Sequence, residues 1–251
     1  MNLEFYTEAF LAMMGGVPLT LQLAASAIIC GAVLALLLAL MRLSGVTVLD
    51  WIARLYIFVF RGTPLLVQIF IIYYGLSQFP AIRYSFLWPI LREPYWCAII
   101  ALTLNNAAYA GEIIRGGLLS VPHGQVEAAR ACGMSRFTCF RRVVMPLAIR
   151  QALPGYGNEM ISMVKATSLA SIITLMEVTG IAAKLISESY RVIEVFVIAG
   201  ALYLAINFVL TRLLLIAEYR LTPYLRQPTV SILTEGKSLC VKLSLPMPRW
   251  R

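Results

Sequence analysis

The chain is poor in charged residues. Only 13% of its 251 residues are Asp, Glu, Lys or Arg, whereas 60% are hydrophobic. A soluble domain carries about 25% charged residues, so this deficit argues against a water-soluble protein and indicates that lipid is the main solvent. The length is that of one compact membrane domain.

Histidine and closely spaced cysteines are also scarce. His123 is the only histidine, so no nucleophile–base–orienter triad can be assembled without it. The five cysteines lack the spacing of a metal knuckle or redox pair, and we interpret Cys30 and Cys97 as filler in apolar runs. His123 and Glu127 have helical spacing, but two ligands do not make a metal site. We therefore expect neither catalytic residues nor a metal.

Acidic residues number 12 against 21 basic ones, which gives a net charge of +9. A nucleic-acid-binding protein can show such an excess, but aromatic and basic residues are not interleaved here on a polar face. Basic cytoplasmic loops of a membrane protein produce the same excess. We therefore expect contact with membrane lipid and no nucleic-acid partner.

No basic residue precedes Arg42, and Glu4 and Glu8 lie near the start of the chain, so residues 1–20 do not resemble a cleavable signal peptide. Long apolar runs follow, and a backbone in lipid must satisfy its hydrogen bonds internally. We predict an all-α integral membrane fold, with a transmembrane domain over residues 1–222 and a loosely ordered cytoplasmic tail over 223–251. The five predicted transmembrane helices are 17–41, 51–74, 95–111, 153–176 and 195–211.

The connections between these five spans differ in basic residues. With an outside N-terminus, 15 Lys and Arg residues fall on the inside and 4 on the outside, and Arg61 and Lys165 lie within spans. The opposite orientation would reverse this bias. The sequence therefore predicts a periplasmic N-terminus and a cytoplasmic C-terminus.

Residues 124–146 form a basic segment between the third and fourth spans. The segment predicts a first helix over 124–132 that Gly133 ends in the left-handed conformation. Ser135 can cap a second helix, which we expect to pass through Phe140 and stop near Pro146. Composition alone leaves two functions open, a docking site for a partner protein and a basic amphipathic linker on anionic headgroups.

Specific motifs resolve this choice. Glu127, Ala128, Ala129, Gly133 and Pro146 have the spacing of the EAA signature, so the segment resembles that of ABC-importer permeases, with Val143 and Met145 in place of the usual Ile and Leu. Residues 60–68, 109–117, 121–125 and 158–169 are similar to other signatures of polar amino-acid permeases. Residues 73–80 and 174–180 look most like the M-type subunits for arginine, octopine and nopaline.

The resemblance implies a MetI-like permease fold in a multi-pass protein of the bacterial inner membrane, with residues 124–146 as the cytoplasmic coupling helix. The implied partners are two ATP-binding cassette subunits, a periplasmic substrate-binding protein, and a second permease subunit of the Q type or a second copy of this chain. No cofactor is expected on this chain, with ATP used by the partner subunit. Gly236-Lys237-Ser238 resembles the end of a phosphate-binding loop, but Ser231 stands where that loop needs its first glycine.

Polar residues within the spans are costly and usually face a bundle interior or water. The candidate pathway or substrate residues are Arg61, Thr63, Asn105, Glu112, Glu159, Lys165 and Ser168. Structural roles remain open for several of them: a helix bend at Arg61, helix–helix contact at Asn105, snorkelling at Glu159, and an ion pair of Glu112 with Arg115.

Glu159 and Lys165 lie about 120° apart on a helix and about 9 Å apart along its axis, so we do not expect them to pair. Two other functions compete with an importer for an opine or a basic amino acid such as arginine. One is a secondary transporter driven by an ion gradient, with Glu159 as proton carrier. The other is a membrane enzyme that uses Glu112, His123 and Glu127.

Overall fold

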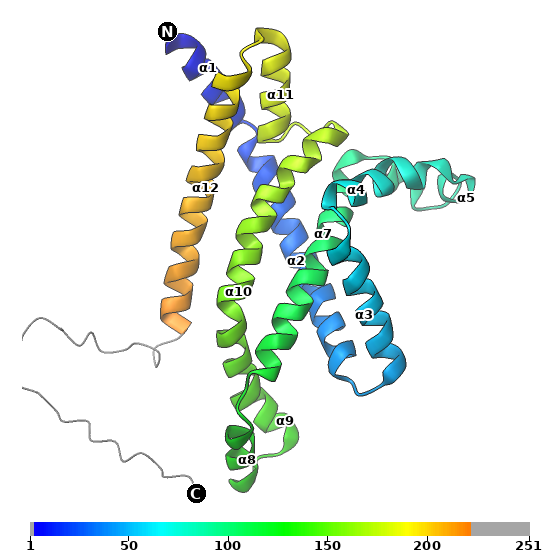
Figure 1. Ribbon diagram of the computed structural model, residues 1–251, viewed down its shortest axis with the longest axis vertical. Helices are drawn as coiled ribbons and strands as arrows, with labels where there is room; N and C mark the ends of the chain where they lie inside the picture. The colour runs from blue at the N-terminus through cyan, green and yellow to red at the C-terminus, as the bar shows by residue number, and fades with distance from the viewer. Residues whose placement is uncertain (1–2, 222–251) are drawn as a thin grey trace, which may run out of the picture.

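The computed structural model describes residues 3–221, and all secondary structure within that range is helical. Three stretches are long and apolar enough to cross a membrane (Figure 1): Glu4–Leu43, Pro94–Leu119 and Val192–Leu221. The first contains α1 (Leu3–Met14) and α2 (Val17–Leu43), and the others are α7 (Pro94–Leu119) and α12 (Val192–Leu221).

Two further spans are bent. Helix α3 (Thr47–Gly62) and the helical stretch Leu65–Gln78 meet at 105°, and the stretch Arg136–Ile173 meets α11 (Val178–Ser189) at 46°. By length and composition the described residues therefore contain three candidate spans, or five if each bent pair counts as one. Helix α11 lies in a region that the sequence predicted as a connection.

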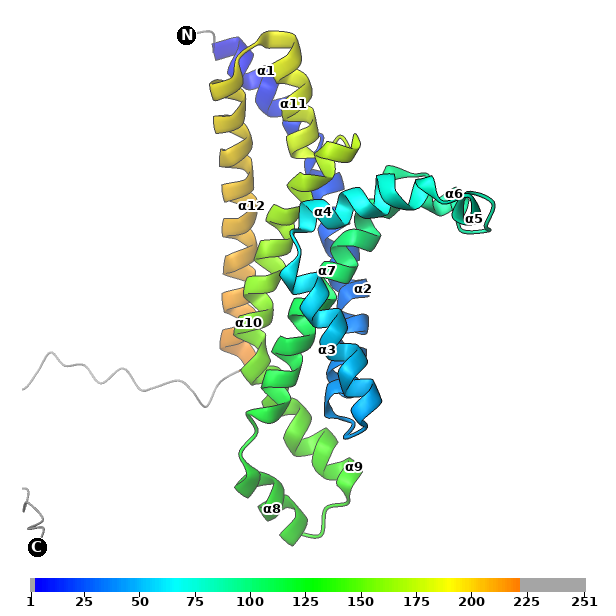
Figure 2. The same cartoon turned by 45° about the vertical axis from the view of Figure 1, so that its right-hand side comes forward.

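The helix bend left open at Arg61 is present in the second span and is large. Thr63 and Pro64 are both extended (ψ 143° and 135°), and proline disfavours a helical conformation in the residue before it. After this break, α4 (Leu65–Phe70), η1 (Ile71–Gly75) and η2 (Leu76–Gln78) lead into an arm. The arm, with α5 (Pro80–Arg83) and α6 (Trp88–Leu91), projects sideways from the long helices (Figure 2).

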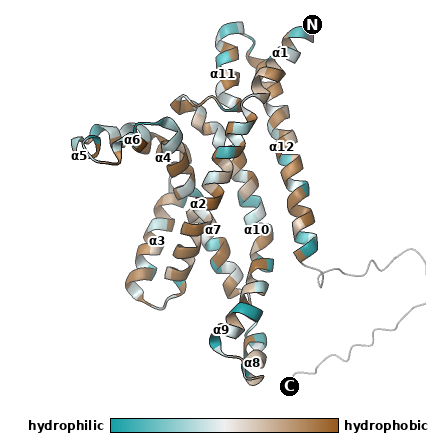
Figure 3. Cartoon of the chain, turned by 180° about the vertical axis from the view of Figure 1, so that it is seen from behind, coloured by the Kyte–Doolittle hydropathy of each residue, from teal (hydrophilic) through white to brown (hydrophobic). Residues whose placement is uncertain are grey.

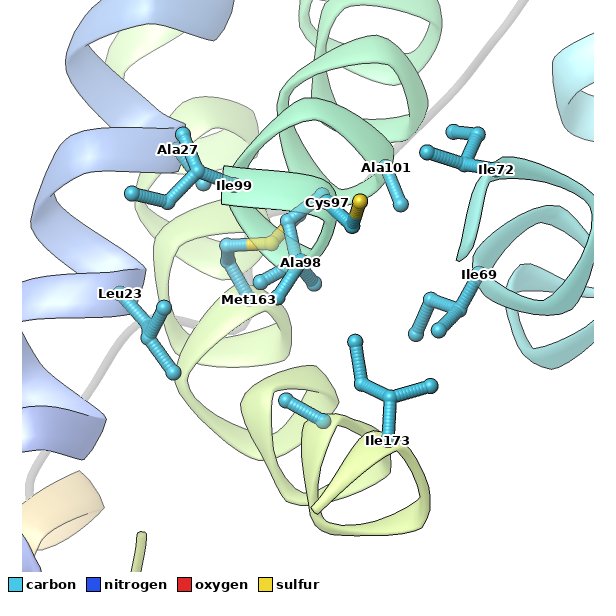
Figure 4. Close-up of a cluster of buried hydrophobic side chains, with 12 residues drawn as sticks. Leu23, Ala27, Ile69, Ile72, Cys97, Ala98, Ile99, Ala101, Met163 and Ile173 are labelled. Carbon is cyan, nitrogen blue, oxygen red and sulfur yellow. The ribbon is translucent and has the colours of Figure 1, made fainter. Parts of the chain in front are cut away.

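The core lies where α2, α7 and α10 (Met145–Ala166) pack together. Figure 4 shows Leu23 and Ala27 of α2 on the side of α7 that carries Ile99, whereas Cys97 and Ala101 point from the opposite side of α7 towards Ile69 and Ile72. Close approach needs Gly31, because a Cβ there would lie 2.5 Å from Asn106 Nδ2. Asn106 in turn donates to the Ala27 carbonyl at 3.2 Å.

Cys97 is buried in this cluster, as predicted, but the prediction that Cys30 fills the core is wrong because Cys30 is exposed. Helix α2 turns its small residues towards α7, which leaves Cys30 on another face. Many large apolar side chains are likewise exposed on the long helices, such as Val33 (70%) and Leu204 (73%). Hydrophobic colour covers these helices, and hydrophilic colour gathers at the α8–α9 end (Figure 3). This distribution is what lipid contact requires.

The predicted helix–turn–helix over 124–146 is present as α8 (His123–Ala131) and α9 (Arg136–Cys139), at the end of the molecule opposite α1 and α11 (Figure 1). Gly133 has φ +77°, and Ser135 Oγ accepts a hydrogen bond from Thr138 N at 3.3 Å. The expectation that the second helix stops near Pro146 is wrong. A π-turn, η3 (Phe140–Val144), leads directly into α10, and Pro146 lies in the first turn of α10, where a missing N–H costs little.

One buried carboxylate joins three helices. Glu177 is 0% exposed and caps α11 by accepting from Gly180 N at 2.9 Å. Its other oxygen accepts from Tyr203 Oη of α12 at 2.7 Å and from Thr20 Oγ1 of α2 at 3.4 Å. These contacts fix the bend between η4 (Thr167–Ile173) and α11 against two long helices.

Candidate functional site

A cavity of about 760 Å³ lies between α1, α2, α10 and α12 and is lined only by apolar side chains. A polar solute would lose its water there without gaining hydrogen bonds. This cavity therefore suits acyl chains or another apolar surface, and the candidate site for a polar ligand lies elsewhere.

A polar cavity of about 450 Å³ lies at the break between α3 and α4, and α7 and α10 form its other walls. Four of the predicted pathway residues line it: Arg61, Thr63, Asn105 and Glu159. They come from three separate stretches of the chain, so the sequence predicted the residues but not their convergence. Tyr109 and Ser162 also line this cavity and were not predicted.

Hydrogen bonds from side-chain amides stabilise the break between α3 and α4. Gln68, only 6% exposed, donates through Nε2 to the carbonyls of Phe60 at 2.9 Å and Thr63 at 3.1 Å, and lies 2.8 Å from Thr63 Oγ1. These carbonyls belong to the end of α3, where the helix leaves acceptors without intrahelical partners. Gln68 thus replaces backbone hydrogen bonds lost at the break. A single glutamine in an apolar run was the only sequence signal for this role.

Asn105 completes this network from α7. Its Nδ2 donates to Gln68 Oε1 at 3.1 Å and to the Phe60 carbonyl at 3.4 Å. Its structural role in helix–helix contact is thereby confirmed. Since Asn105 also lines the polar cavity, contact with a ligand stays a prediction.

Both signs of charge are present in the polar cavity. Arg61 is exposed, and its guanidinium carbon lies 5.0 Å from the centre of the Tyr109 ring. Glu159 is half-buried on α10. Within residues 3–221, no carboxylate lies within 4.0 Å of the Arg61 nitrogens. The cavity therefore offers a cation and an anion that are both available to a ligand.

A second cavity of about 550 Å³ adjoins the first and is lined partly by Arg42, Arg54, Arg61 and Glu112. The predicted pair of Glu112 with Arg115 is confirmed at 2.6 Å, and Arg42 lies 3.4 Å from the same carboxylate. Asp50 bridges the cations, at 3.2 Å from Arg42 and 2.8 Å from Arg54. The involvement of Arg42 and Asp50 was not predicted, because the pairs of Arg42 with Glu112 of α7 and with Asp50 of α3 join different helices.

Lys165 and Ser168 lie apart from these residues. Lys165 is exposed in the last turn of α10, and Ser168 Oγ donates to its carbonyl at 2.7 Å. Neither residue lines the polar cavities described above. As predicted, no ion pair joins Lys165 and Glu159 in the part of the chain that the structure describes.

The α8–α9 segment presents Glu127 and Ala128 at the surface, whereas Ala129 is buried (6% exposed) and Pro146 is half-buried. Exposed arginines surround it: Arg130, Arg136, Arg141 and Arg142. Glu127 forms no ion pair with another residue of the described range 3–221. Its carboxylate is therefore available to an outside group.

Potential metal ligands are dispersed. Over residues 3–221 no group of three or more His, Cys, Asp or Glu side chains is placed to hold a metal ion.

The family described as "Binding-protein-dependent transport system inner membrane component" matches residues 27–223. The chain is 64% identical to an octopine transport system permease protein of Rhizobium meliloti, over 89% of this chain and 91% of that protein. It is 52% identical to a nopaline transport system permease protein of Agrobacterium fabrum, over 90% and 94% of the two chains.

Among solved structures, an amino acid ABC transporter crystallised with histidines superposes with a TM-score of 0.75 at 36% identity, and the match covers 87% of this chain and 97% of that one. The fold is the all-helical MetI-like permease fold, in a multi-pass protein of the inner membrane that acts as a transport subunit and not as an enzyme. The chain belongs to the family of inner-membrane permease components of binding-protein-dependent ABC transporters.

Proposed function

We propose that this chain forms the path by which an ATP-driven importer moves an opine, such as octopine or nopaline, or a basic amino acid such as arginine across the inner membrane. The 64% and 52% identities to octopine and nopaline permeases support this substrate class. Family membership favours ATP as the energy source over the ion-gradient alternative.

The polar cavity carries this proposal. Its volume of about 450 Å³ falls in the usual range for small-molecule sites, roughly 300–1,000 Å³. A substrate with a guanidinium and a carboxylate needs an anion and a cation together. Glu159 receives the guanidinium, and Arg61 receives the carboxylate. Thr63, Asn105 and Ser162 supply uncharged hydrogen-bonding groups around them.

The proposed topology has five spans, with the N-terminus periplasmic and the C-terminus cytoplasmic. Two bent helix pairs bring the candidate spans to five. The basic α8–α9 segment lies at the end opposite α1, as this orientation requires.

Residues 124–146 act as the coupling helix in this proposal and dock on one of two ATP-binding subunits. Glu127 and Ala128 are exposed for that contact, and the turn at Gly133 sets the angle between α8 and α9. The π-turn η3 continues directly into α10, which carries Glu159. Movement of the docked segment is thereby transmitted along one helix, over about 21 Å from Met145 to Glu159.

The remaining partners are a periplasmic binding protein that delivers substrate and a second permease subunit, of the Q type or a second copy of this chain. No cofactor binds this chain directly, and ATP is hydrolysed by the cassette subunits. Lys165 and Ser168 remain candidates for contact with the substrate outside the described cavities.

The test is uptake by the complete transporter with its cognate binding protein. Uptake of labelled arginine, histidine, octopine and nopaline is measured one solute at a time, first with the parent chain and then with Glu159→Gln. We expect the parent to take up at least one of these solutes and Glu159→Gln to raise the KM for solutes with a guanidinium.

Glu188→Gln is the matched control, because Glu188 is 60% exposed on α11, outside both polar cavities. A parent complex that transports none of the four solutes would refute the substrate class. Equal KM values for Glu159→Gln and the control would refute the role of the cavity.

A further inference from the structure

The two polar cavities share one wall. Arg61, Gly62 and Tyr109 line both of them. We call the cavity lined by Glu159 the outer cavity and the cavity lined by Glu112 the inner cavity. The Arg61 guanidinium, 5.0 Å from the centre of the Tyr109 ring, is part of the wall that separates them. Stacking of this kind is a weak bond that a charged ligand can replace.

Arg61 has one carboxylate on each side. Its charge acts on Glu159, which lines the outer cavity, and on Glu112, which lines the inner one. Neither carboxylate is within 4.0 Å of Arg61, and Glu112 already pairs with Arg42 and Arg115. The Arg61 guanidinium is therefore attracted by the carboxylates of Glu159 and Glu112 and forms an ion pair with neither.

The backbone beside Arg61 leaves room for movement. A Cβ at Gly62 would meet no atom within 4 Å, and α3 ends at this residue. Arg61 itself is exposed. Its side chain can turn towards either cavity without displacing packed neighbours.

The inner cavity is positively charged. Three arginines, Arg42, Arg54 and Arg61, and one carboxylate, Glu112, line it. Arg54 is 62% exposed and is held by Asp50 alone among the described residues. Arg42 already lies near both Asp50 and Glu112, so Arg54 is the better placed of the two to receive a further carboxylate in this cavity.

We propose that Arg61 is a movable gate between these cavities, and that the inner cavity is a second binding station for the same solute, a molecule with a guanidinium and a carboxylate. Arg61 holds the carboxylate of the solute in the outer cavity, leaves Tyr109, and passes that carboxylate to Arg54 in the inner cavity. This inference rests on the proposed function and adds the order in which the groups act.

The test uses the complete transporter in liposomes. Uptake of labelled arginine, histidine, octopine and nopaline by the parent complex is measured first, which tests the proposed function separately, and a transported solute is then used for the variants. Efflux of preloaded solute without ATP is compared for Tyr109→Leu and Tyr109→Phe. Loss of the aromatic face should raise this efflux roughly three- to thirtyfold, whereas phenylalanine keeps the face and should leave it near the parent level.

Arg61→Gln is the second gate variant, since it removes the other partner of the contact between Arg61 and Tyr109. Its efflux should match that of Tyr109→Leu, and the double variant should leak no more than either single one, because both remove one contact. The gate is refuted if ATP-free efflux stays at the parent level in both single variants while assembled complex is present.

The second station is tested by Arg54→Gln, with Arg92→Gln on the exposed arm as the matched control. Because Arg54 lines only the inner cavity, its loss should lower the maximal uptake rate at least threefold and leave KM unchanged. An increase in KM at constant maximal rate, or no difference from the control, would overturn the second station.

Discussion

Replacement of Glu177 by alanine should lower the free energy of unfolding by about 3 kcal/mol. Loss of the α11 N-cap bond to Gly180 N costs about 1 kcal/mol. The Tyr203 hydroxyl, which now donates to Glu177 at 2.7 Å, loses a buried acceptor, which costs about 2 kcal/mol. Tyr203 stays 3.1 Å from Thr179 Oγ1, so its hydroxyl is not left entirely without a partner.

The assay is thermal unfolding of the purified, detergent-solubilised protein. A loss of about 3 kcal/mol corresponds to a decrease in apparent Tm of about 6–12 °C for a chain of this length. Glu177→Gln keeps the side-chain volume and a carbonyl acceptor for the cap, so its Tm should fall by roughly a third as much. Glu188→Ala, at an exposed position on the same helix, should leave Tm unchanged.

This reasoning fails if Glu177→Ala is no less stable than Glu188→Ala, or if the glutamine variant is as unstable as the alanine one. A double variant with Tyr203→Phe provides a further check. The two losses should not add, because they remove the same hydrogen bond.

Three other predictions concern the packing, the break and the docking segment. Gly16→Ala should destabilise the chain by about 1–3 kcal/mol in the same Tm assay, because its Cβ would lie 2.7 Å from the first backbone nitrogen of α11, whereas Gly116→Ala has open space and should be neutral or more stable. Gln68→Leu leaves two carbonyls at the end of α3 without their donor, so uptake should fall and stability should drop by about 2 kcal/mol; unchanged uptake would contradict its role at the break. Glu127→Lys and Gly133→Asp should abolish uptake while membrane content measured by immunoblot stays normal, and uptake with normal ATPase association would contradict the coupling role.

Local signals predicted local structure well. Gly133 and Ser135 sit at the turn between two short helices, as expected from the conformations that a glycine and a capping serine favour. The predicted spans 17–41, 95–111 and 195–211 fall inside α2, α7 and α12, because lipid selects for uninterrupted apolar helices of this length.

Features that depend on packing were not predictable from these patterns. Pro146 was expected to end a helix, but a proline is equally suited to the first turn of the next one, and only the π-turn before it decides between the two. The break of 105° after Thr63 is stabilised by the Gln68–Asn105 amide pair, whose partners lie 37 residues apart. Helix α11 depends on the buried cap at Glu177, which a polar motif in a connection does not reveal.

The candidate site shows the same limit. A charged side chain within a membrane span is energetically costly, so Arg61 and Glu159 could be identified from the sequence as candidate functional residues. Their meeting in one cavity with Tyr109 depends on the positions of three helices. An aromatic residue in an apolar run gives no sign that it lines a polar cavity, so Tyr109 could be found only from the structure.

The direct continuation of η3 into α10 links the two proposed binding sites through one helix, so binding at one site can be coupled to binding at the other. Helix α10 forms part of the wall of the outer cavity, and the α8–α9 segment precedes it through η3. If an ATP-binding subunit on α8–α9 changes the affinity of the cavity for its solute by some factor, the solute must change the affinity for that subunit by the same factor. Solute occupancy is then measurable at the α8–α9 end as a difference in the affinity for that subunit.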